Sequence, residues 1–415
     1  MSNAGAFTKA GTGTLTLSGT NTYTGATTVS AGVLNIQNAA ALGGIGSGTT
    51  VSSGTALQIQ GNIAVGAEAL TLNGAGISST GALRNISGTN SWSGAVTLGS
   101  ASEISSDAGT LTLSGAFANG GFLATFDGAG DTTVSGVISG TGGLTKGGTG
   151  ILTLSGTGNN TFTGTLTVNS GTVLFNKTAN LDVLAGALVI GDGVGLDTVR
   201  TLTANQLNGA AATINSSGLL DLNGTSQDIT TLSMTGGSIT TGVGTLTLGG
   251  TVTGNANATA ATISGNLALG ANRIFNIADG AAALDMDISA VVSGAFTVTK
   301  NGTGTMVLSG ANTYTGATTV SAGVLNIQNA TGLGTTAGGT TVSSGATLQL
   351  QGGITVGAEA LTLTGTGASG QTGALVNVSG TNNYGGLLTL AGATTISSDS
   401  GTLNLTNAGD RKSVV

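Results

Sequence analysis

Short runs in which hydrophobic and polar residues alternate recur along the whole chain. In Thr14–Leu17, Leu15 and Leu17 alternate with Thr14 and Thr16, and this period of two places successive side chains on opposite faces of a β-strand. The same alternation occurs in Val33–Ile36, 56–59, 69–72, Thr110–Leu113 and 245–248. Gly, Asn and Ser-Gly pairs lie between the runs and favour turns. The chain is therefore predicted to consist of short strands joined by tight turns.

Comparable strands return about every 20 residues, as the pairs Leu15/Leu17, Leu34/Ile36 and Leu57/Ile59 show. A strand of this length buries little alone, but one strand stacked on each coil gives a continuous core of inward Leu, Val and Ile. A sandwich does not need such regular coils, and an outer-membrane barrel needs longer strands and aromatic girdles. The sequence thus predicts an all-β protein, a parallel β-helix (β-solenoid) that is continuous over residues 1–409.

The chain also contains a long internal repeat. The segment 21–39 recurs without change at 312–330, and the match extends over 9–113 and 300–405. The beginning of this module appears a third time, in diverged form, at 146–175. Such a long repeat must itself be composed of several of the smaller strand units.

Composition excludes several kinds of chemistry. The 415 residues include 77 Gly and no Pro, Cys or His, and the formal charge is −7 with only nine Lys and Arg. Zinc fingers, disulfide frameworks and catalysis by Ser-His-Asp or Cys-His are therefore absent. Nine scattered cations give no basic surface for nucleic acid. The lack of Pro suits an uninterrupted ladder of β-strands.

Acidic residues are the only candidates for catalysis or metal binding. Asp285 and Asp287 lie two apart on a predicted strand, a separation that could suit an inverting glycosidase. Leu284, Met286 and Ile288 are expected to point inward, so both carboxylates are interpreted as a solvated face. Asp192 and Asp197 flank a Gly-rich segment that resembles a calcium loop only faintly, because it lacks alternating oxygen ligands. We assign no catalytic, cofactor-binding or metal-binding residue.

Residues at equivalent positions of the repeats are candidate ligand-binding groups. Lys9, Lys146 and Lys300 begin the three copies and are interpreted as solubilising residues of an exposed coil rather than as contacts to an anionic polysaccharide. The aromatic residues are interpreted as stacking at corners rather than as a carbohydrate platform; they are Tyr23, Phe162 and Tyr314, and the pair Trp92 and Tyr384.

Threonine is the most suggestive outward residue. In Thr14/Thr16, Thr110/Thr112 and Thr245/Thr247 the hydroxyl groups are expected on the solvent face, where stacked coils could form regular ladders, as in ice-binding solenoids. The alternative is that Thr is simply a soluble residue that favours β-strands.

The three repeat beginnings resemble a known family. Lys9-Ala-Gly-Thr-Gly-Thr-Leu-Thr-Leu-Ser-Gly, followed by Asn21-Thr-Tyr-Thr-Gly, is similar to the autotransporter-associated β-strand repeat of bacterial passenger domains. The corresponding motifs are Asn160-Thr-Phe-Thr-Gly and Asn312-Thr-Tyr-Thr-Gly. This resemblance implies a right-handed parallel β-helix that is secreted through a C-terminal outer-membrane translocator barrel. It also implies an extracellular or outer-membrane-surface location.

The ends of the sequence depart from the family pattern. No signal peptide and no barrel segment are visible, and residues 410–415, DRKSVV, break the repetitive texture with three consecutive charges. We interpret the chain as a fragment and residues 410–415 as a tail that is not native. Cut ends would expose the edges of the strand ladders, so end-to-end self-association is expected.

The sequence favours a structural stalk or an adhesin-like surface without catalysis, with a host-cell, matrix or polysaccharide ligand. Two alternatives stay open at this point. The first is a β-helical enzyme that acts on polysaccharides, which would require clustered acids in a groove. The second is an ice-binding solenoid that uses ladders of threonine.

Overall fold

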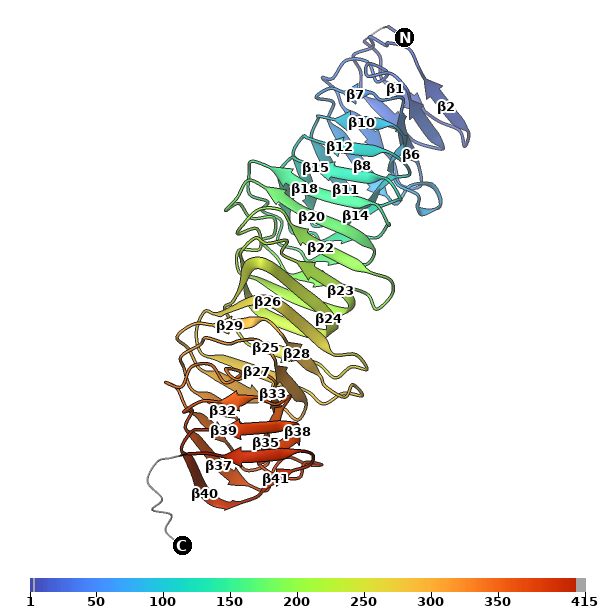
Figure 1. Ribbon diagram of the computed structural model, residues 1–415. Helices are drawn as coiled ribbons and strands as arrows, with labels where there is room; N and C mark the ends of the chain where they lie inside the picture. The colour runs from blue at the N-terminus through green and yellow to red at the C-terminus, as the bar shows by residue number, and fades with distance from the viewer. Residues whose placement is uncertain (3, 408–415) are drawn as a thin grey trace. The chain divides into compact units, whose positions relative to one another are not determined.

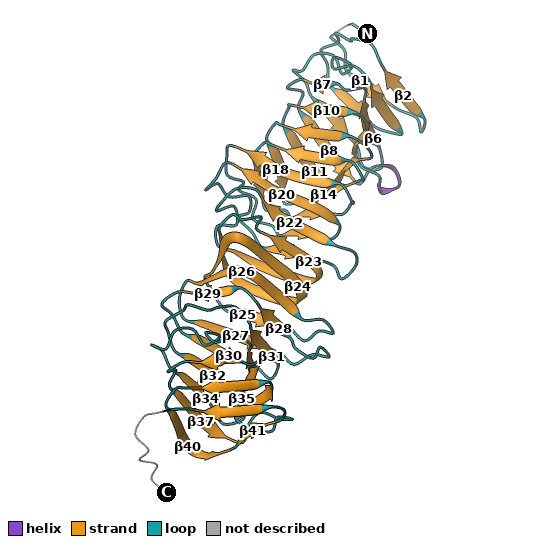
Figure 2. Ribbon diagram, viewed as in Figure 1, coloured by secondary structure: helices purple, strands orange, loops and turns teal. Residues whose placement is uncertain are grey.

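The computed structural model describes residues 1–2 and 4–407, which fold into two units of stacked β-solenoid coils (Figures 1 and 2). The predicted all-β, parallel solenoid fold is confirmed, and the coils make about 19 turns. Within the described residues the one helical element is a single 3-10 turn, η1 (Ile77–Ser79), and none of their helices could span a membrane. Residues 410–415, interpreted as a non-native tail, lie outside the described part.

The chain folds into two compact units, Met1–Ala210 and Ala211–Val415. The continuity of one β-helix over residues 1–409 stays a prediction. The strands of the first unit are β1 (Phe7–Lys9), β2 (Thr14–Leu17), β3 (Thr27–Val29), β4 (Val33–Ile36), β5 (Thr49–Val51), β6 (Ala56–Gln60), β7 (Ala64–Val65), β8 (Leu70–Gly74), β9 (Leu83–Ser87), β10 (Thr89–Trp92), β11 (Val96–Ser106), β12 (Thr110–Leu113), β13 (Phe117–Gly120), β14 (Ala124–Asp127), β15 (Asp131–Val134), β16 (Ile138–Gly140), β17 (Leu144–Lys146), β18 (Ile151–Gly156), β19 (Leu166–Val168), β20 (Gly171–Lys177), β21 (Leu188–Ile190) and β22 (Asp197–Thr201).

The second unit begins within β23 and contains the remaining strands. They are β23 (Ala210–Asp221), β24 (Gln227–Leu248), β25 (Val252–Gly254), β26 (Ala261–Leu269), β27 (Arg273–Ile277), β28 (Met286–Ile288), β29 (Val291–Ser293), β30 (Val298–Asn301), β31 (Thr305–Leu308), β32 (Thr318–Val320), β33 (Gly323–Ile327), β34 (Thr340–Val342), β35 (Ala346–Gln351), β36 (Thr355–Val356), β37 (Leu361–Gly365), β38 (Leu375–Ser379), β39 (Thr381–Tyr384), β40 (Leu388–Thr394), β41 (Ile396–Ser398) and β42 (Thr402–Leu405).

Strands of the first unit pair in parallel along three faces. One face runs through β1, β3, β5, β8, β11, β13 and β16. The second runs through β2, β4, β6, β9, β11, β14, β17, β19 and β21. The third runs through β7, β10, β12, β15, β18, β20 and β22. Paired strand residues therefore lie directly above their counterparts in the next coil, apart from local register shifts such as the one between Leu98 and Ser102.

The second unit repeats this arrangement by itself. The long strand β24 pairs with both β25 and β26 and so belongs to two faces. One face continues through β25, β27, β30, β32, β34, β37 and β40. The other continues through β26, β28, β31, β33, β35, β38 and β41. A third face is formed by β36, β39 and β42. The inward columns are mainly buried Leu, Ile and Val, with Phe, Met, Tyr and Lys at a few positions, so most layers of the core are aliphatic.

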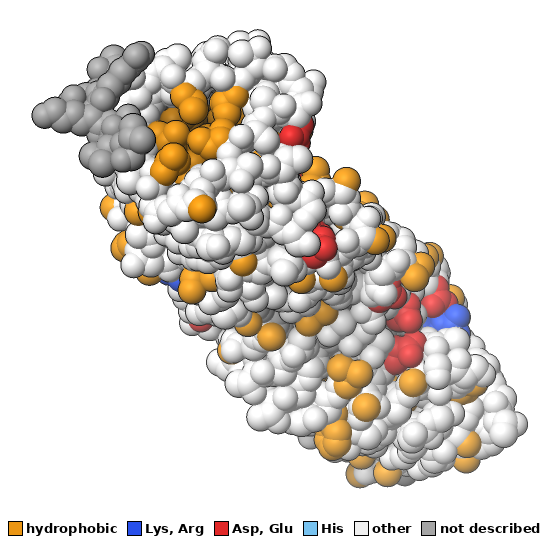
Figure 3. Space-filling model, turned by 90° about the horizontal axis from the view of Figure 1, so that it is seen from below, with side chains coloured by type: hydrophobic (Ala, Val, Ile, Leu, Met, Phe, Trp, Pro, Cys, Tyr) orange, Lys and Arg blue, Asp and Glu red, His pale blue; other side chains and the backbone are white. Residues whose placement is uncertain are grey.

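The final coil of the second unit leaves apolar side chains in contact with solvent. Leu387, Leu390 and Leu405 are 56%, 57% and 47% exposed, whereas the inward residues of earlier coils are buried. Figure 3 shows hydrophobic side chains gathered on the face from which this end of the unit is seen. The expectation of end-to-end self-association stays a prediction.

Glycine is required at some corners because neighbouring coils approach closely. A Cβ on Gly164 would lie 2.2 Å from the carbonyl oxygen of Gly142, and a Cβ on Gly316 would lie 2.2 Å from Phe296. Both glycines end the Asn-Thr-Tyr/Phe-Thr-Gly motif. The motif thus ends in Gly because any side chain there would push two coils apart.

We expect Gly164→Ala to lower the stability of the solenoid by about 1–3 kcal/mol, the usual cost of forcing extra volume into a packed site. The unfolding midpoint in urea, followed by circular dichroism, measures the effect. Gly46→Ala is the matched control, because a Cβ at Gly46 would meet nothing within 4 Å. Equal midpoints for the two variants would show that the close approach does not constrain the coil.

Candidate functional site

The lysine that begins each repeat faces the core. Lys146 lies in an inward column between Phe126 and Val168, and Lys300 lies between Phe275 and Val320. Lys9, Lys146 and Lys300 are only 5%, 3% and 0% exposed. The interpretation of these residues as solubilising groups of an exposed coil is therefore wrong.

The ammonium groups are buried because backbone carbonyl groups of the adjacent turns accept hydrogen bonds from them. Lys300 Nζ donates to the carbonyl oxygens of Asn301 at 3.1 Å, Gly302 at 2.8 Å and Ala322 at 3.1 Å. In the first module, Lys9 Nζ donates to the three equivalent carbonyl oxygens, those of Ala10, Gly11 and Ala31. Lys146 Nζ donates to the carbonyl oxygens of Gly148 and Ser170. Each lysine thus joins its own glycine turn to the following coil.

Burial disfavours the charged form of Lys146 and of Lys300. It lowers the pKa of Lys146 and of Lys300 to about 8, although nearby carboxylates (Asp127 and Asp131 for Lys146, Asp285 for Lys300) oppose the shift. These are core amines held by carbonyl oxygens, so they offer no cationic surface to an anionic polysaccharide.

The asparagine of the repeat motif also links coils. Asn160 Oδ1 accepts the backbone N–H of Ile138 at 2.9 Å, and Asn160 Nδ2 donates to the carbonyl oxygen of Val183 at 3.0 Å. Asn312 connects Val292 and Gly332 in the same way, at 2.9 and 2.8 Å. The side-chain amide therefore replaces backbone pairing at a corner where the strands are interrupted.

The aromatic residues of the repeats are buried. Tyr23, Phe162 and Tyr314 are 3%, 0% and 0% exposed, and Trp92 and Tyr384 are 0% and 1% exposed. They lie at inward positions of the coils and offer no face to a carbohydrate, which agrees with the interpretation of these residues as packing groups. Trp92 Nε1 donates to the carbonyl oxygen of Glu68 at 2.7 Å.

A buried chain of polar side chains accompanies these aromatic residues in both long modules. Tyr314 Oη and Thr318 Oγ1 lie 2.6 Å apart, Thr318 stacks on Thr340, and Thr340 Oγ1 donates to Glu359 Oε1 at 3.0 Å. The counterparts in the first module are Tyr23, Thr27, Thr49 and Glu68. Burial raises the pKa of Glu359 and of Glu68. Sequence reasoning missed both glutamates, although each follows the same Val-Gly-Ala segment.

Asp285 and Asp287 do not form a solvated face. Asp285 is 6% exposed, and its carboxylate accepts the backbone N–H groups of Gly280 at 2.7 Å and Thr305 at 2.8 Å. Burial raises the pKa of Asp287. The prediction that both carboxylates point into water is wrong, because one of them satisfies backbone donors at a corner.

The faint calcium loop is not assembled either. Asp192 is exposed and accepts the backbone N–H of Val194 at 2.8 Å, whereas Asp197 is fully buried at the start of β22. Within residues 1–2 and 4–407, no three His, Cys, Asp or Glu side chains lie close enough together to hold a metal ion.

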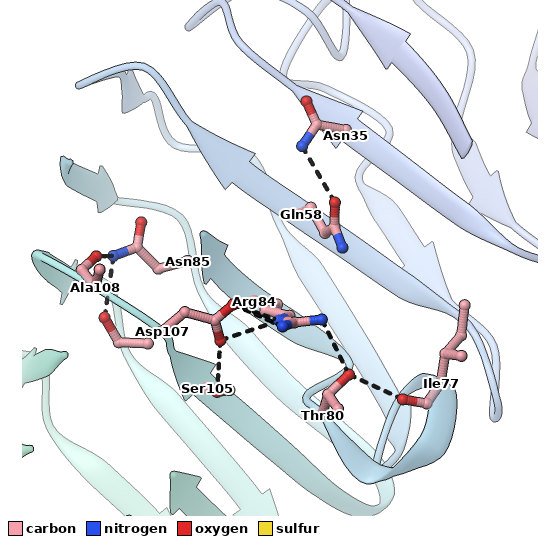
Figure 4. A network of polar contacts seen from close by, with 10 residues as sticks. Asn35, Gln58, Ile77, Thr80, Arg84, Asn85, Ser105, Asp107 and Ala108 are labelled. Atoms are coloured by element: carbon pink, nitrogen blue, oxygen red, sulfur yellow. Dashed lines mark hydrogen bonds and ion pairs between the residues drawn. The ribbon is translucent and has the colours of Figure 1, made fainter. Parts of the chain in front are cut away.

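A charged network crosses neighbouring coils of the first unit (Figure 4). Arg84 Nε donates to both oxygens of Asp107, at 3.0 and 2.8 Å, and Arg84 Nη1 donates to Thr80 Oγ1 at 3.3 Å. Nearby, burial and the charge of Asp127 raise the pKa of Glu103 to about 7. In the second module Val376 stands where the first has Arg84, so the network is a local link between coils and not a shared site.

Threonine ladders exist, but mostly at other positions than expected. Thr14 and Thr16 lie opposite Val33 and Asn35, and Thr245 and Thr247 lie opposite Asn266 and Ala268. Thr110 stacks on Thr89 on one side and lies opposite Asp131 on the other, and Thr112 stacks on Thr133. Two outward columns of five threonines occur instead: Thr8, Thr28, Thr50, Thr71 and Thr97, and Thr299, Thr319, Thr341, Thr362 and Thr389. The repeated Thr-Thr-Val triplet was the signal that could have located them.

We expect Lys300→Met to destabilise the second unit at neutral pH by about 1–3 kcal/mol, because three carbonyl groups lose a charged donor. The native pKa of about 8 lies below the ordinary 10.5. The unfolded chain therefore binds more protons between these values, and stability should rise with pH across that window. Urea unfolding at pH 7 and at intervals up to pH 10.5 measures both effects.

Lys300→Met should show a smaller rise in stability above pH 8 than the unmodified chain. Asp279→Asn is the control, because Asp279 is exposed and its loss removes a charge without touching the core. A variant Lys300→Met as stable as this control would contradict the proposed linkage of the two coils.

Comparison with known families agrees with the geometry of the repeats. The passenger-associated-transport-repeat matches residues 7–36, 144–174 and 298–327, the segments that contain the buried Lys, Asn and aromatic residues described above. Neither the curated proteins nor the solved structures gave a match to the chain. The chain is a β-solenoid that carries three passenger-associated-transport-repeats, the repeat of autotransporter passenger domains.

Proposed function

We propose that this chain forms part of an autotransporter passenger at the bacterial cell surface, where it acts as a stalk or an adhesin-like surface without catalysis. One observation carries the proposal. In all three passenger-associated-transport-repeats the Lys and Asn side chains are buried and join one coil to the next, and the aromatic side chain is buried in the core. The repeat therefore holds successive coils together, which allows a long and rigid solenoid.

The distribution of acids supports a role without catalysis. A polysaccharide hydrolase needs two carboxyl groups facing one cleft, whereas Asp285 accepts hydrogen bonds from backbone N–H groups and Glu359 accepts one from the buried Thr340. In this proposal the outer surface of the coils, which carries few charges and is rich in threonine, makes the contacts. The proposed partners of the chain are a translocator barrel and a host-cell, matrix or polysaccharide ligand.

Surface display tests the proposal. The chain, fused in front of an outer-membrane translocator barrel in a Gram-negative host, is expected to reach the cell surface and to increase adhesion of the cells to host cells or matrix. Antibody labelling and protease accessibility on intact cells measure display, and counting of attached cells measures adhesion.

The control is the same barrel carrying an unrelated folded passenger of similar length. Retention of the chain inside the cell would contradict its role as a passenger. Display without more adhesion than the control would contradict the adhesin-like role and leave that of a stalk.

Ice binding is a second candidate function, favoured by the two in-register threonine columns. Coils stack about 4.8 Å apart, so each column presents a regular series of hydroxyl and methyl groups. We expect thermal hysteresis in the purified chain and its loss in Thr50→Lys/Thr341→Lys, which interrupts both columns. Thr16→Lys, which lies outside them, is the control. Absence of hysteresis in the unmodified chain removes this candidate.

A further inference from the structure

A cavity of about 290 Å³ lies at one corner of the second unit. One side is formed by residues 330–336, which follow β33, and the other by β36 with Gly357 and Glu359. Leu333 and Val356, which are 3% and 2% exposed, give it an apolar floor. Small-molecule sites usually measure roughly 300–1,000 Å³, so this cavity suits a small ligand.

One carboxylate and several hydroxyl groups complete the lining. Glu359 is 3% exposed and is held through Oε1 by the Thr340 hydroxyl at 3.0 Å. Four threonines, Thr331, Thr335, Thr336 and Thr355, also line the cavity. A site with an apolar floor and a few convergent polar groups has the general composition of a ligand pocket.

Two buried hydroxyl groups near this carboxylate lack a hydrogen-bond partner. Thr335 Oγ1 and Tyr384 Oη are buried without a partner among the described residues. Burial, and after it the charge of the Glu359 carboxylate, raises the pKa of the Tyr384 hydroxyl. Buried polar groups are normally paired, and leaving one unpaired costs about 1–3 kcal/mol. Thr335 lines the cavity, and its hydroxyl therefore has an unmet hydrogen bond that a rotation of the side chain would direct toward a bound molecule.

The internal repeat shows that these hydroxyl groups are particular to the second module. The carboxylate and its Tyr-Thr-Thr chain are present in both modules, but all four cavity threonines replace residues without a hydroxyl group. The pairs are Ala40 and Thr331, Gly44 and Thr335, Ile45 and Thr336, and Ala64 and Thr355. In addition, Trp92, whose Nε1 is hydrogen-bonded, is replaced by Tyr384, whose hydroxyl is not. The changes therefore gather hydroxyl groups around one buried carboxylate.

We propose that this cavity binds a single sugar ring. The hydroxyl groups of a sugar would bond Thr335, its neighbouring threonines and the Glu359 carboxylate, and a C–H face of the ring would lie on Leu333 and Val356. The volume excludes an oligosaccharide from the enclosed part, so the ring is a free monosaccharide or the end of a glycan. The site does not depend on surface display, because the purified chain tests it alone.

Saturation-transfer NMR and calorimetry with free glucose, galactose, mannose, fucose and N-acetylglucosamine test the proposal. For a ligand of this size we expect at least one sugar to bind with a Kd of about 1 mM. Glu359→Gln should weaken binding about tenfold or more, because it replaces a charged acceptor. Thr335→Gly/Thr336→Ile, which places at these two positions the residues that the first module has there, Gly44 and Ile45, should weaken it by a similar factor.

Glu68→Gln is the matched control, since it alters the same buried chain in the module that lacks the four threonines, and it should leave the Kd unchanged. If Glu359→Gln unfolds the unit, the double variant still tests the proposal, because Gly and Ile occupy these two positions in the folded loop of the first module. Absence of binding by all five sugars would overturn the proposal. So would a Kd that the double variant leaves unchanged.

Discussion

The pairing of backbone groups between successive coils is the constraint on which the rest of the structure depends. Parallel strands about 4.8 Å apart give each N–H and C=O a partner in a neighbouring coil, and every column of side chains must then repeat in register. Pro would interrupt the ladders and is absent from the chain. At corners such as Gly164, carbonyl oxygens of adjacent coils come so close that only glycine fits.

Corners also create the need for polar side chains inside the solenoid. Where strands end, backbone donors and acceptors lose their ladder partners and would be buried unpaired. Lys300 supplies donors to three such carbonyl oxygens, Asn312 serves one carbonyl and one N–H, and the Asp285 carboxylate accepts two N–H groups. The most recognisable residues of the repeat are therefore those that complete the hydrogen bonds of the coil.

This logic explains which features could be predicted from the sequence. Period-two runs such as Thr14–Leu17 identified strands, and their spacing of about 20 residues identified coils. The lysines were misplaced because Lys is almost never buried, although Leu144 and Lys146 share a face in the same three-residue strand. The cavity could not have been predicted, since residues 331–336 meet Thr355 and Glu359 only through the coil stacking.

The same constraint determines where a solenoid of this kind can acquire new chemistry. Inward columns are fixed, because a substitution in one coil must still pack against the coils on either side. A corner loop is less constrained where the adjacent coil leaves room: a Cβ at Gly44 would lie 3.5 Å from the nearest atom, the carbonyl oxygen of Tyr23, so this position can change while the register persists. Glu68 and Glu359 illustrate the difference: both keep the buried hydrogen bond to a threonine, while the loop residues Gly44 and Ile45 correspond to Thr335 and Thr336. A repeat whose inward residues stack the coils can in this way gain a polar cavity at one corner without any change in its fold.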